Sequence, residues 1–318
     1  MAPRVYIIDD LRPEAVELAK QHFEVIQQGD TGFEKWETEA EYIIMRGTQL
    51  RADQIESAPL KAIAKQGVGV DNIDINACHA KGVVVMNTPG VNAKSVAEVA
   101  VMLTLAVARE LVDITMKVRA EGRLFTMFDC KGMQVTGCTV GVIGMGSIGK
   151  QTANIFQKGM DCKIYTYDPF VSQDEWKDDI IHTRLDKLDD LLSLCDVVSI
   201  HCPLSDSSKN MINLEKMRKM KPSAILINVS RGGIINEDDL YIALKERVIF
   251  GAGLDVLEDE PPRKEVHSHL WTLPNIITTP HCGSGTEIAQ EAAATMAVQN
   301  IIDFVEKGIQ TNAIIRKS

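Results

Sequence analysis

The most constraining feature of this sequence is a repeated alternation of short β-branched runs with longer helical patterns. Such alternation is typical of parallel sheets whose two faces are covered by helices. We therefore expect an α/β protein with two doubly wound parallel sheets. The first series of strand-like runs comprises residues 5–8, 42–45, 62–65 and 83–86, and the second comprises 140–143, 163–167, 197–200, 224–228, 252–256 and 276–278.

The length of 318 residues also favours two domains, because one hydrophobic core rarely grows beyond about 250–300 residues. A long helical pattern, 95–119, separates the two series, and its first half is apolar on nearly every face. We expect it to be buried between domains or subunits. A second helical pattern, 286–307, has no strand of its own and should pack on the first domain. The predicted domains are 1–98 with 286–318, and 99–285.

Charge and cysteine content disfavour several classes of partner. The chain has 44 acidic and 34 basic residues, a net charge of −10 and no dense basic block, which argues against nucleic acid or an anionic membrane. None of the seven cysteines forms a CxxC pair, so we expect no metal site and reduced thiols in a cytoplasmic protein. The N-terminus lacks the apolar core of a signal peptide. The longest apolar stretch, 99–108, is far shorter than the roughly 20 residues of a membrane-spanning helix.

A GxGxxG pattern joins the first strand of the second series to a helical segment. Gly144 would allow the tight turn, Gly146 would let the backbone approach a pyrophosphate, and Gly149 would permit close helix packing. The helix N-terminus then offers N–H groups and a partial positive charge to phosphates. A glycine-rich turn without a ligand is the alternative for this motif alone. The pattern predicts a Rossmann dinucleotide-binding domain, with cofactor contacts at Gly144, Gly146, Ser147, Ile148 and Gly149.

Asp168 ends the next strand-like run, about 20 residues beyond the glycine motif. This is the distance expected of a carboxylate that binds the adenosine ribose hydroxyls. A carboxylate there would repel a 2′-phosphate, and no arginine stands among residues 169–178. We therefore expect NAD rather than NADP, although Asp168 taken alone could be a solvated residue at a strand end.

Three further segments follow strands of the second series and carry side chains suited to carbonyl reduction. Arg231 precedes two glycines, and its planar guanidinium suits a carboxylate. His281 could pass a proton to a developing alkoxide, and a carboxylate from the acidic loop 258–260 could stabilise the protonated imidazole. A surface arginine, a structural histidine and a solvated acidic loop are the alternatives for each segment considered alone.

Taken together, these motifs resemble the D-isomer-specific 2-hydroxyacid dehydrogenase family over nearly the whole chain. The resemblance is to its phosphoglycerate dehydrogenase-like members without a regulatory domain. It implies a Rossmann NAD-binding domain, a flavodoxin-like substrate domain, and an oxidoreductase that interconverts a small 2-oxo acid and its D-2-hydroxy acid. Besides the glycine motif and Asp168, the matching stretches are 67–74, 87–90, 95–98, 201–204, 230–233 and 255–262.

The resemblance also implies roles for individual residues. Arg231 would bind the substrate carboxylate and polarise the carbonyl, His281 would be the acid or base, and Glu260 would be its partner. Asp255 would meet the nicotinamide carboxamide. Backbone N–H groups around Val68 and Gly69 would hold the substrate carboxylate. The remaining implied cofactor contacts are Cys202 and Pro203 near the adenosine, Val229, Ser230 and Gly283.

The identity of the substrate is less constrained. Family members that bind a substrate phosphate use basic side chains; here Arg46 is present, Lys65 stands where arginine is common, and residues 126–127 are Thr and Met. We expect Arg46 and Lys65 to contact a substrate without a phosphate, with 3-phosphoglycerate dehydrogenase as the alternative. The chain ends at Ser318, so no regulatory domain is expected. Nothing in the sequence explains Cys282, which follows the predicted catalytic histidine.

Two further expectations concern partners. The helical segment after Ser95 resembles the family's dimerisation arm, whose apolar surface would be too large to leave exposed, so we expect a homodimer. A hypothesis from another class is a regulatory protein of the corepressor type that senses NAD(H). Such proteins retain much of the same set of catalytic side chains.

Overall fold

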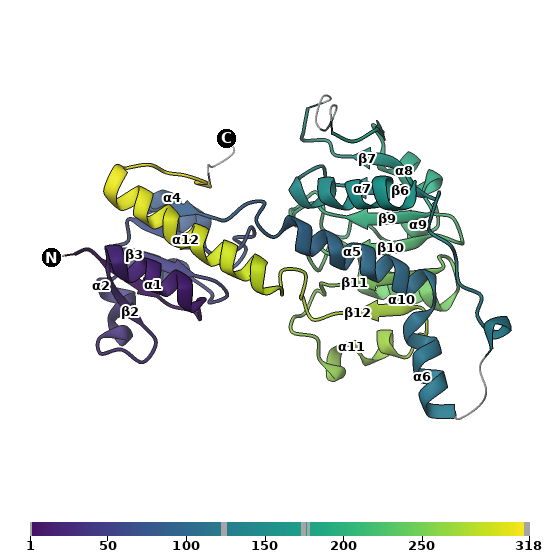
Figure 1. The fold of residues 1–318 in the computed structure, drawn as a ribbon, viewed down its shortest axis with the longest axis horizontal. Coiled ribbons are helices and arrows are strands. Elements are labelled where there is room, and N and C mark those ends of the chain that lie inside the picture. Colours follow the sequence, from purple (N-terminus) through teal and green to yellow (C-terminus); the bar gives the residue numbers. More distant parts are fainter. Residues whose placement is uncertain (1, 122–125, 173–175, 177–178, 315–318) are drawn as a thin grey trace. The chain divides into compact units, whose positions relative to one another are not determined.

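The computed structural model describes residues 2–121, 126–172, 176 and 179–314. The chain forms two compact units, Met1–Asn92 with Gly285–Ser318, and Ala93–Ser284. Each unit contains one parallel sheet with helices on both of its faces, as the alternating pattern predicts (Figure 1).

The sheet of the first unit has five parallel strands in the order β2-β1-β3-β4-β5, which is the flavodoxin-like order. Strand β2 was not among the predicted runs. It lies at an edge of the sheet, where a strand needs no continuous apolar sequence, and it has polar residues at both ends. The strands are β1 (Arg4–Ile7), β2 (Glu24–Gln27), β3 (Tyr42–Met45), β4 (Ala62–Lys65) and β5 (Val84–Met86).

Alternate residues of these strands pack on opposite helical layers, because successive side chains of a strand point to opposite faces. Val5 and Ile7 pack with α1 and α12 on one face, and Tyr6 packs with α3 and α4 on the other. Figure 1 shows α12, from the end of the chain, beside α1. The helices of this unit are α1 (Pro13–His22), α2 (Trp36–Glu39), α3 (Ala52–Ser57), α4 (Ile75–Lys81) and α12 (Glu287–Lys307), with a 3₁₀ turn η1 (Phe33–Lys35).

The sheet of the second unit has seven parallel strands in the order β12-β11-β10-β9-β6-β7-β8. The chain starts in the middle at β6, moves outward to β8, and then returns to β9 on the other side of β6. Ligands of such sheets bind at the carboxyl ends of the strands near this reversal. The strands are β6 (Thr139–Ile143), β7 (Lys163–Tyr167), β8 (His182–Arg184), β9 (Val197–Ile200), β10 (Ile225–Asn228), β11 (Gly251–Leu254) and β12 (Ile276–Thr278).

Two apolar clusters cover the faces of this second sheet. One cluster contains side chains of α5 and α7, which lie across the sheet in Figure 1, and the other contains side chains of α8, α10 and α11. The helices are α5 (Ala93–Ala108), α6 (Leu111–Glu121), α7 (Ser147–Met160), α8 (Leu188–Leu194), α9 (Leu214–Met217), α10 (Glu237–Lys245) and α11 (Lys264–Trp271), with a 3₁₀ turn η2 (Met127–Asp129).

The long helical pattern predicted for 95–119 is two helices in the structure. α5 ends at Ala108 and α6 begins at Leu111, and Glu110 between them is left-handed, with φ of 49°. α5 belongs whole to the second unit, where the side chains of one face are buried against α7 and strands β10 and β11. Among the described residues, no helix has both the length and the apolar character needed to cross a bilayer.

Candidate active site

The glycine turn between β6 and α7 leaves open space in front of a helix N-terminus. A Cβ on Gly144, whose φ is 97°, would lie 2.7 Å from the Cys202 nitrogen, and one on Gly149 would lie 2.2 Å from the Gly144 carbonyl oxygen. Among the described residues, no heavy atom lies within 4 Å of a Cβ position on Gly146, and no side chain caps α7 there. The first N–H groups of α7 can therefore receive a pyrophosphate.

The carboxylate of Asp168 is fixed beside this turn by two backbone amides. Its Oδ2 accepts from the Met145 N–H and its Oδ1 from the Phe170 N–H, both at 2.9 Å. An ionised carboxylate has about four acceptor positions, so both oxygens can accept further bonds. Asp168 is thus placed at the carboxyl end of β7, as a ligand of ribose hydroxyls requires.

An arginine that the sequence reasoning missed lies beside Asp168. Arg184 ends the edge strand β8, and its guanidinium donates to the backbone carbonyls of Asp168, Val171 and Ser172. Arg184 is more than ten residues from Asp168 in the sequence, and the pairing of β8 with β7 places it opposite Thr166. Its N–H groups hold the turn that follows Asp168.

The turn that carries Arg231 is held by the buried side chain of Asn228 at the end of β10. Asn228 donates to the Arg231 carbonyl at 2.8 Å, and its Oδ1 accepts from the N–H and hydroxyl of Ser230 at 3.1 and 2.9 Å. Arg231 itself donates from Nη1 to the Ser230 carbonyl at 2.7 Å. The backbone of this turn is therefore fixed from both sides of Ser230.

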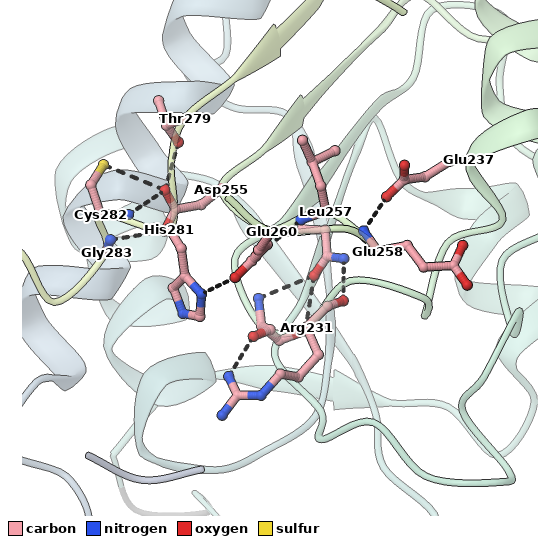
Figure 2. A network of polar contacts seen from close by, with 12 residues as sticks. Arg231, Glu237, Asp255, Leu257, Glu258, Glu260, Thr279, His281, Cys282 and Gly283 are labelled. Atoms are coloured by element: carbon pink, nitrogen blue, oxygen red, sulfur yellow. Dashed lines mark hydrogen bonds and ion pairs between the residues drawn. The ribbon is translucent and has the colours of Figure 1, made fainter. Parts of the chain in front are cut away.

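His281 and Glu260 form a hydrogen-bonded pair. The imidazole Nδ1 lies 2.8 Å from Glu260 Oε2, and Glu260 Oε1 accepts from the Leu257 N–H at 3.1 Å. Figure 2 shows the imidazole directed at this carboxylate, with Arg231 nearby. The His281 side chain is 44% exposed, and Nε2 has no hydrogen-bond partner among the described residues. The ring thus presents one nitrogen to a ligand while the other is held.

Burial alone would raise the pKa of the Glu260 carboxyl. The hydrogen bond and charge of His281, the Leu257 N–H and the positive charge of Arg231 outweigh burial, so the pKa lies below its ordinary value. Figure 2 shows Arg231 in the same part of the second unit as this carboxylate. Arg231, Glu260 and His281 therefore form one cluster, although the sequence separates them widely.

The loop that carries His281 is fixed by Asp255, which is buried at the end of β11. One carboxylate oxygen accepts from the Thr279 hydroxyl at 2.6 Å and the Cys282 N–H at 2.9 Å, and the other accepts from the Gly283 N–H at 2.8 Å. His281 sits within this loop in a left-handed conformation with φ of 53°, which is uncommon outside glycine and occurs at functional sites.

Ser95 and Cys202 also lie in this part of the second unit. The Ser95 hydroxyl, in α5, donates to the Gly283 carbonyl at 2.6 Å and so ties the His281 loop to that helix. Cys202 follows β9 next to the glycine turn and precedes Pro203, and burial raises the pKa of its thiol to about 11. Cys202 is therefore a protonated, unreactive thiol at neutral pH.

The predicted substrate residues of the first unit lie at the end of β4 and just after β3 and β4. Gly67, with φ of 117°, donates to the Thr88 hydroxyl at 2.8 Å, and the Asn87 side chain donates to the Val68 carbonyl at 2.7 Å. These bonds fix the turn that contains Val68 and Gly69. Val68 is 39% exposed.

Arg46 and Lys65, the two basic residues predicted to contact the substrate, differ in their surroundings. Arg46 is exposed, and its backbone is held by the Asp9 carboxylate, which accepts from the N–H groups of Arg46 and Gly47 at 2.6 and 2.9 Å. Lys65 is only 7% exposed, and its ammonium group donates to the Gln66 carbonyl at 2.9 Å. The structure therefore offers one solvent-facing and one buried cation at the ends of adjacent strands.

Comparisons with known proteins decide the family. The model described as "D-isomer specific 2-hydroxyacid dehydrogenase, NAD binding domain" matches residues 101–283. The chain is 38% identical to a hydroxypyruvate reductase of Thermotoga maritima, over 96% of this chain and 99% of that protein. This chain belongs to the D-isomer-specific 2-hydroxyacid dehydrogenase family.

Two further relatives show the range of this dehydrogenase family. A D-3-phosphoglycerate dehydrogenase of Methanocaldococcus jannaschii is 36% identical over 98% of this chain, which spans only 59% of that longer protein. An NADPH-dependent glyoxylate/hydroxypyruvate reductase of Sinorhizobium meliloti, solved in complex with NADP and malonate, superposes with a TM-score of 0.85 at 25% identity over 100% of both chains.

Family membership confirms the enzyme class predicted from the motifs. The protein is an oxidoreductase that interconverts 2-oxo and 2-hydroxy acids with a nicotinamide dinucleotide. This function fits the relatives better than the regulatory NAD(H) sensor that the sequence left open. The two-sheet fold of the family is confirmed as well.

Proposed function

We propose that this dehydrogenase reduces a small, unphosphorylated 2-oxo acid of the glyoxylate or hydroxypyruvate type to its D-2-hydroxy acid, with NADH as the preferred donor. The observation that carries the proposal is the His281–Glu260 hydrogen bond of 2.8 Å with the Arg231 charge beside it. This arrangement provides a proton donor, a counter-charge for it and a carboxylate-binding guanidinium in one place. The named relatives that reduce hydroxypyruvate and glyoxylate support the substrate class.

The chemistry divides between the cofactor and the side chains. When bound, a nicotinamide dinucleotide would supply the hydride for the carbonyl carbon. Arg231 binds the substrate carboxylate and polarises the carbonyl. His281 gives the proton on Nε2 to the carbonyl oxygen as it becomes an alkoxide, while Glu260 stabilises the imidazolium before that transfer. One proton and one hydride are thus added across the carbonyl.

The preference for NADH follows from Asp168. Its carboxylate would accept hydrogen bonds from the ribose hydroxyls and would repel a 2′-phosphate. Cys202, Pro203, Val229, Ser230 and Gly283 would surround the cofactor together with the glycine turn, and Asp255 would meet the nicotinamide carboxamide in addition to its bonds within the His281 loop.

We also propose that the protein is a homodimer. α5 and α6 border an apolar groove of about 760 Å³, lined by Val101, Leu105, Leu111 and Ile114 among others. Met102, Leu111 and Met116 are 48%, 54% and 60% exposed. A contiguous apolar surface of this kind is usually covered by a partner. Light scattering should return about twice the chain mass of 35.1 kDa, and the mass of a single chain would contradict the dimer.

A phosphorylated substrate is the second candidate, because Arg46 and Lys65 are cations that a phosphate could use and one relative is a phosphoglycerate dehydrogenase. The test is a panel of glyoxylate, hydroxypyruvate, branched 2-oxo acids and 3-phosphohydroxypyruvate, each with NADH and NADPH. The highest kcat/KM should belong to glyoxylate or hydroxypyruvate with NADH. A preference for 3-phosphohydroxypyruvate would establish the second candidate.

The roles of the side chains are tested by His281→Gln. The variant should lose turnover by at least about a thousandfold while its NADH affinity, measured by fluorescence, stays unchanged. His22→Gln is a matched control, because His22 Nδ1 forms a similar pair with Glu306 at 2.7 Å in the first unit. Near-normal turnover of His281→Gln would refute the proposed mechanism, and NADH binding without turnover of any acid by the unmodified protein would restore the sensor hypothesis.

A further inference from the structure

The loop between β11 and the catalytic Glu260 is held by a second carboxylate, which the proposed mechanism does not use. Glu237 Oε1 accepts from the Glu258 N–H at 2.6 Å, two residues before Glu260. Figure 2 shows this bond on the side of the loop away from His281. Glu260 itself accepts from the Leu257 N–H at 3.1 Å. Two successive amides of the loop thus donate to two different carboxylates.

Glu237 is the first residue of α10, but the start of that helix does not need its carboxylate. The Asn236 side chain caps α10 by accepting from the Asp239 N–H at 2.9 Å. The Glu237 carboxylate instead reaches out to the loop, where burial raises its pKa. A buried carboxylate loses hydrogen bonds to water, and a protein donor must replace them. The Glu258 N–H is that donor.

The same peptide group also lies against the segment that carries Arg231. A Cβ on Gly232 would lie 1.9 Å from the Leu257 carbonyl oxygen and 2.5 Å from the Glu258 nitrogen. The absence of a side chain at Gly232 therefore lets the peptide between Leu257 and Glu258 approach directly beside Arg231. Both contacts of this peptide, with Gly232 and with Glu237, come from the chain segment that follows Arg231.

We infer that Glu237 is a positioning residue that holds the Glu260–His281 pair in register with Arg231. The inference rests on the proposed function, because Glu237 takes no part in the chemistry and would act only through Glu260 and His281. The bond to the Glu258 N–H fixes the peptide between Leu257 and Glu258, and the backbone runs from there to Glu260 two residues later. Without that bond the loop could move away from Gly232, and the carboxylate of Glu260 would no longer be aligned with the imidazole.

Charged and titratable side chains surround both Glu237 and the Glu260–His281 pair. Glu237 faces the charge of Glu258, which raises its pKa, and the side chains of His267 and His269, which lower it. The Glu260–His281 pair faces Arg231, and Asp255 lies behind the His281 loop. Because the His281 hydrogen bond helps to keep the pKa of Glu260 low, loss of alignment would raise that pKa and move the acidic limb of the pH–rate profile towards neutral pH.

Three variants of Glu237 separate the hydrogen bond from the charge. Glu237→Asp keeps the charge but shortens the reach, Glu237→Gln keeps the reach but removes the charge, and Glu237→Ala removes both. Asp238→Ala is the matched control, because Asp238 is the next residue of the same helix turn and is exposed. The assay is the pH dependence of kcat and kcat/KM with the best 2-oxo acid of the panel, together with NADH affinity and thermal unfolding.

We expect Glu237→Asp and Glu237→Ala to lower kcat about tenfold, as loss of one charge-assisted hydrogen bond would, and to move the acidic limb towards neutral pH. Glu237→Gln should keep at least half of the kcat, Asp238→Ala should match the unmodified protein, and NADH affinity should not change. Unchanged profiles for Glu237→Asp would overturn the inference, and so would a larger loss in Glu237→Gln than in Glu237→Asp, since the charge of Glu237 and not its bond to the Glu258 N–H would then be the active property. If His281→Gln is active in the same assay, the proposed function fails instead.

Discussion

Replacement of Asp255 by Asn changes one atom and should both destabilise the second unit and slow turnover. The two carboxylate oxygens accept from three strong donors, the Thr279 hydroxyl and the N–H groups of Cys282 and Gly283, at 2.6–2.9 Å. In either orientation of the Asn amide, its NH₂ group faces at least one backbone N–H. One amide of the buried loop therefore loses its acceptor.

The magnitude follows from those contacts. An unsatisfied buried donor costs about 1–3 kcal/mol, and each of the two remaining bonds loses its charge assistance, about 1 kcal/mol each. The sum is roughly 3–5 kcal/mol, which corresponds to a fall in Tm of about 6–20 °C for a unit of this size. kcat should fall as well, because the His281 loop is released.

Circular dichroism melting and steady-state kinetics measure the two effects of Asp255→Asn. Thr279→Val is the control, because it removes one donor and leaves the carboxylate with both amides. It should cost less than half as much. A Tm within about 2 °C of the unmodified protein, or a Thr279→Val variant as damaged as Asp255→Asn, would refute the assignment of Asp255 as the acceptor that fixes this loop.

Three other outcomes follow from the site. The folded pKa of Glu260 lies below its ordinary 4.5, so its contribution to stability is complete above about pH 4.5 and is lost as pH falls through the folded value. The Tm difference between Glu260→Gln and the unmodified protein should therefore disappear in acid. A difference that stays constant with pH would contradict this. Asp168→Ala should lower the ratio of kcat/KM for NADH over NADPH at least about tenfold, and an unchanged ratio would remove Asp168 from the cofactor site. Arg184→Ala should raise the Kd of NADH about tenfold and leave kcat at saturating NADH unchanged. Arg218→Ala is the control, because Arg218 is exposed. Equal Kd values for the two variants would show that the turn after Asp168 keeps its conformation without Arg184.

The central strands of both sheets could be predicted from sequence, because burial on two faces requires continuous β-branched runs. The predicted runs 42–45 and 62–65 coincide with β3 and β4. The missed strands, β2 and β8, are both at sheet edges. Each has one side without a partner strand and carries polar residues, so its sequence has no run that distinguishes it from a loop.

The candidate catalytic residues could be predicted because each follows a strand, and strand ends are local features of the sequence. The residues that hold them could not. Asp255 was assigned to the cofactor from family resemblance, and its bonds to residues 279–283 depend on the pairing of β11 with β12. Glu237 and Arg184 act on backbone groups 21 and 12–16 residues away. A polar side chain bonded to a distant peptide leaves no spacing pattern, because backbone N–H and C=O groups occur at every position.

The order of the strands explains why Glu260 lies between the other two catalytic candidates. β10, β11 and β12 are neighbours in the sheet, and Arg231, Glu260 and His281 follow them in that order. The sheet ladder continues past the strand ends, since the Asp255 N–H donates to the Asn228 carbonyl at 2.8 Å and the His281 N–H to the Asp255 carbonyl at 2.7 Å. The segment after the middle strand therefore meets both neighbours, and its carboxylate can bond to His281 while it lies within the field of Arg231. The strand order therefore places the segment that carries the carboxylate between the segments that carry Arg231 and His281.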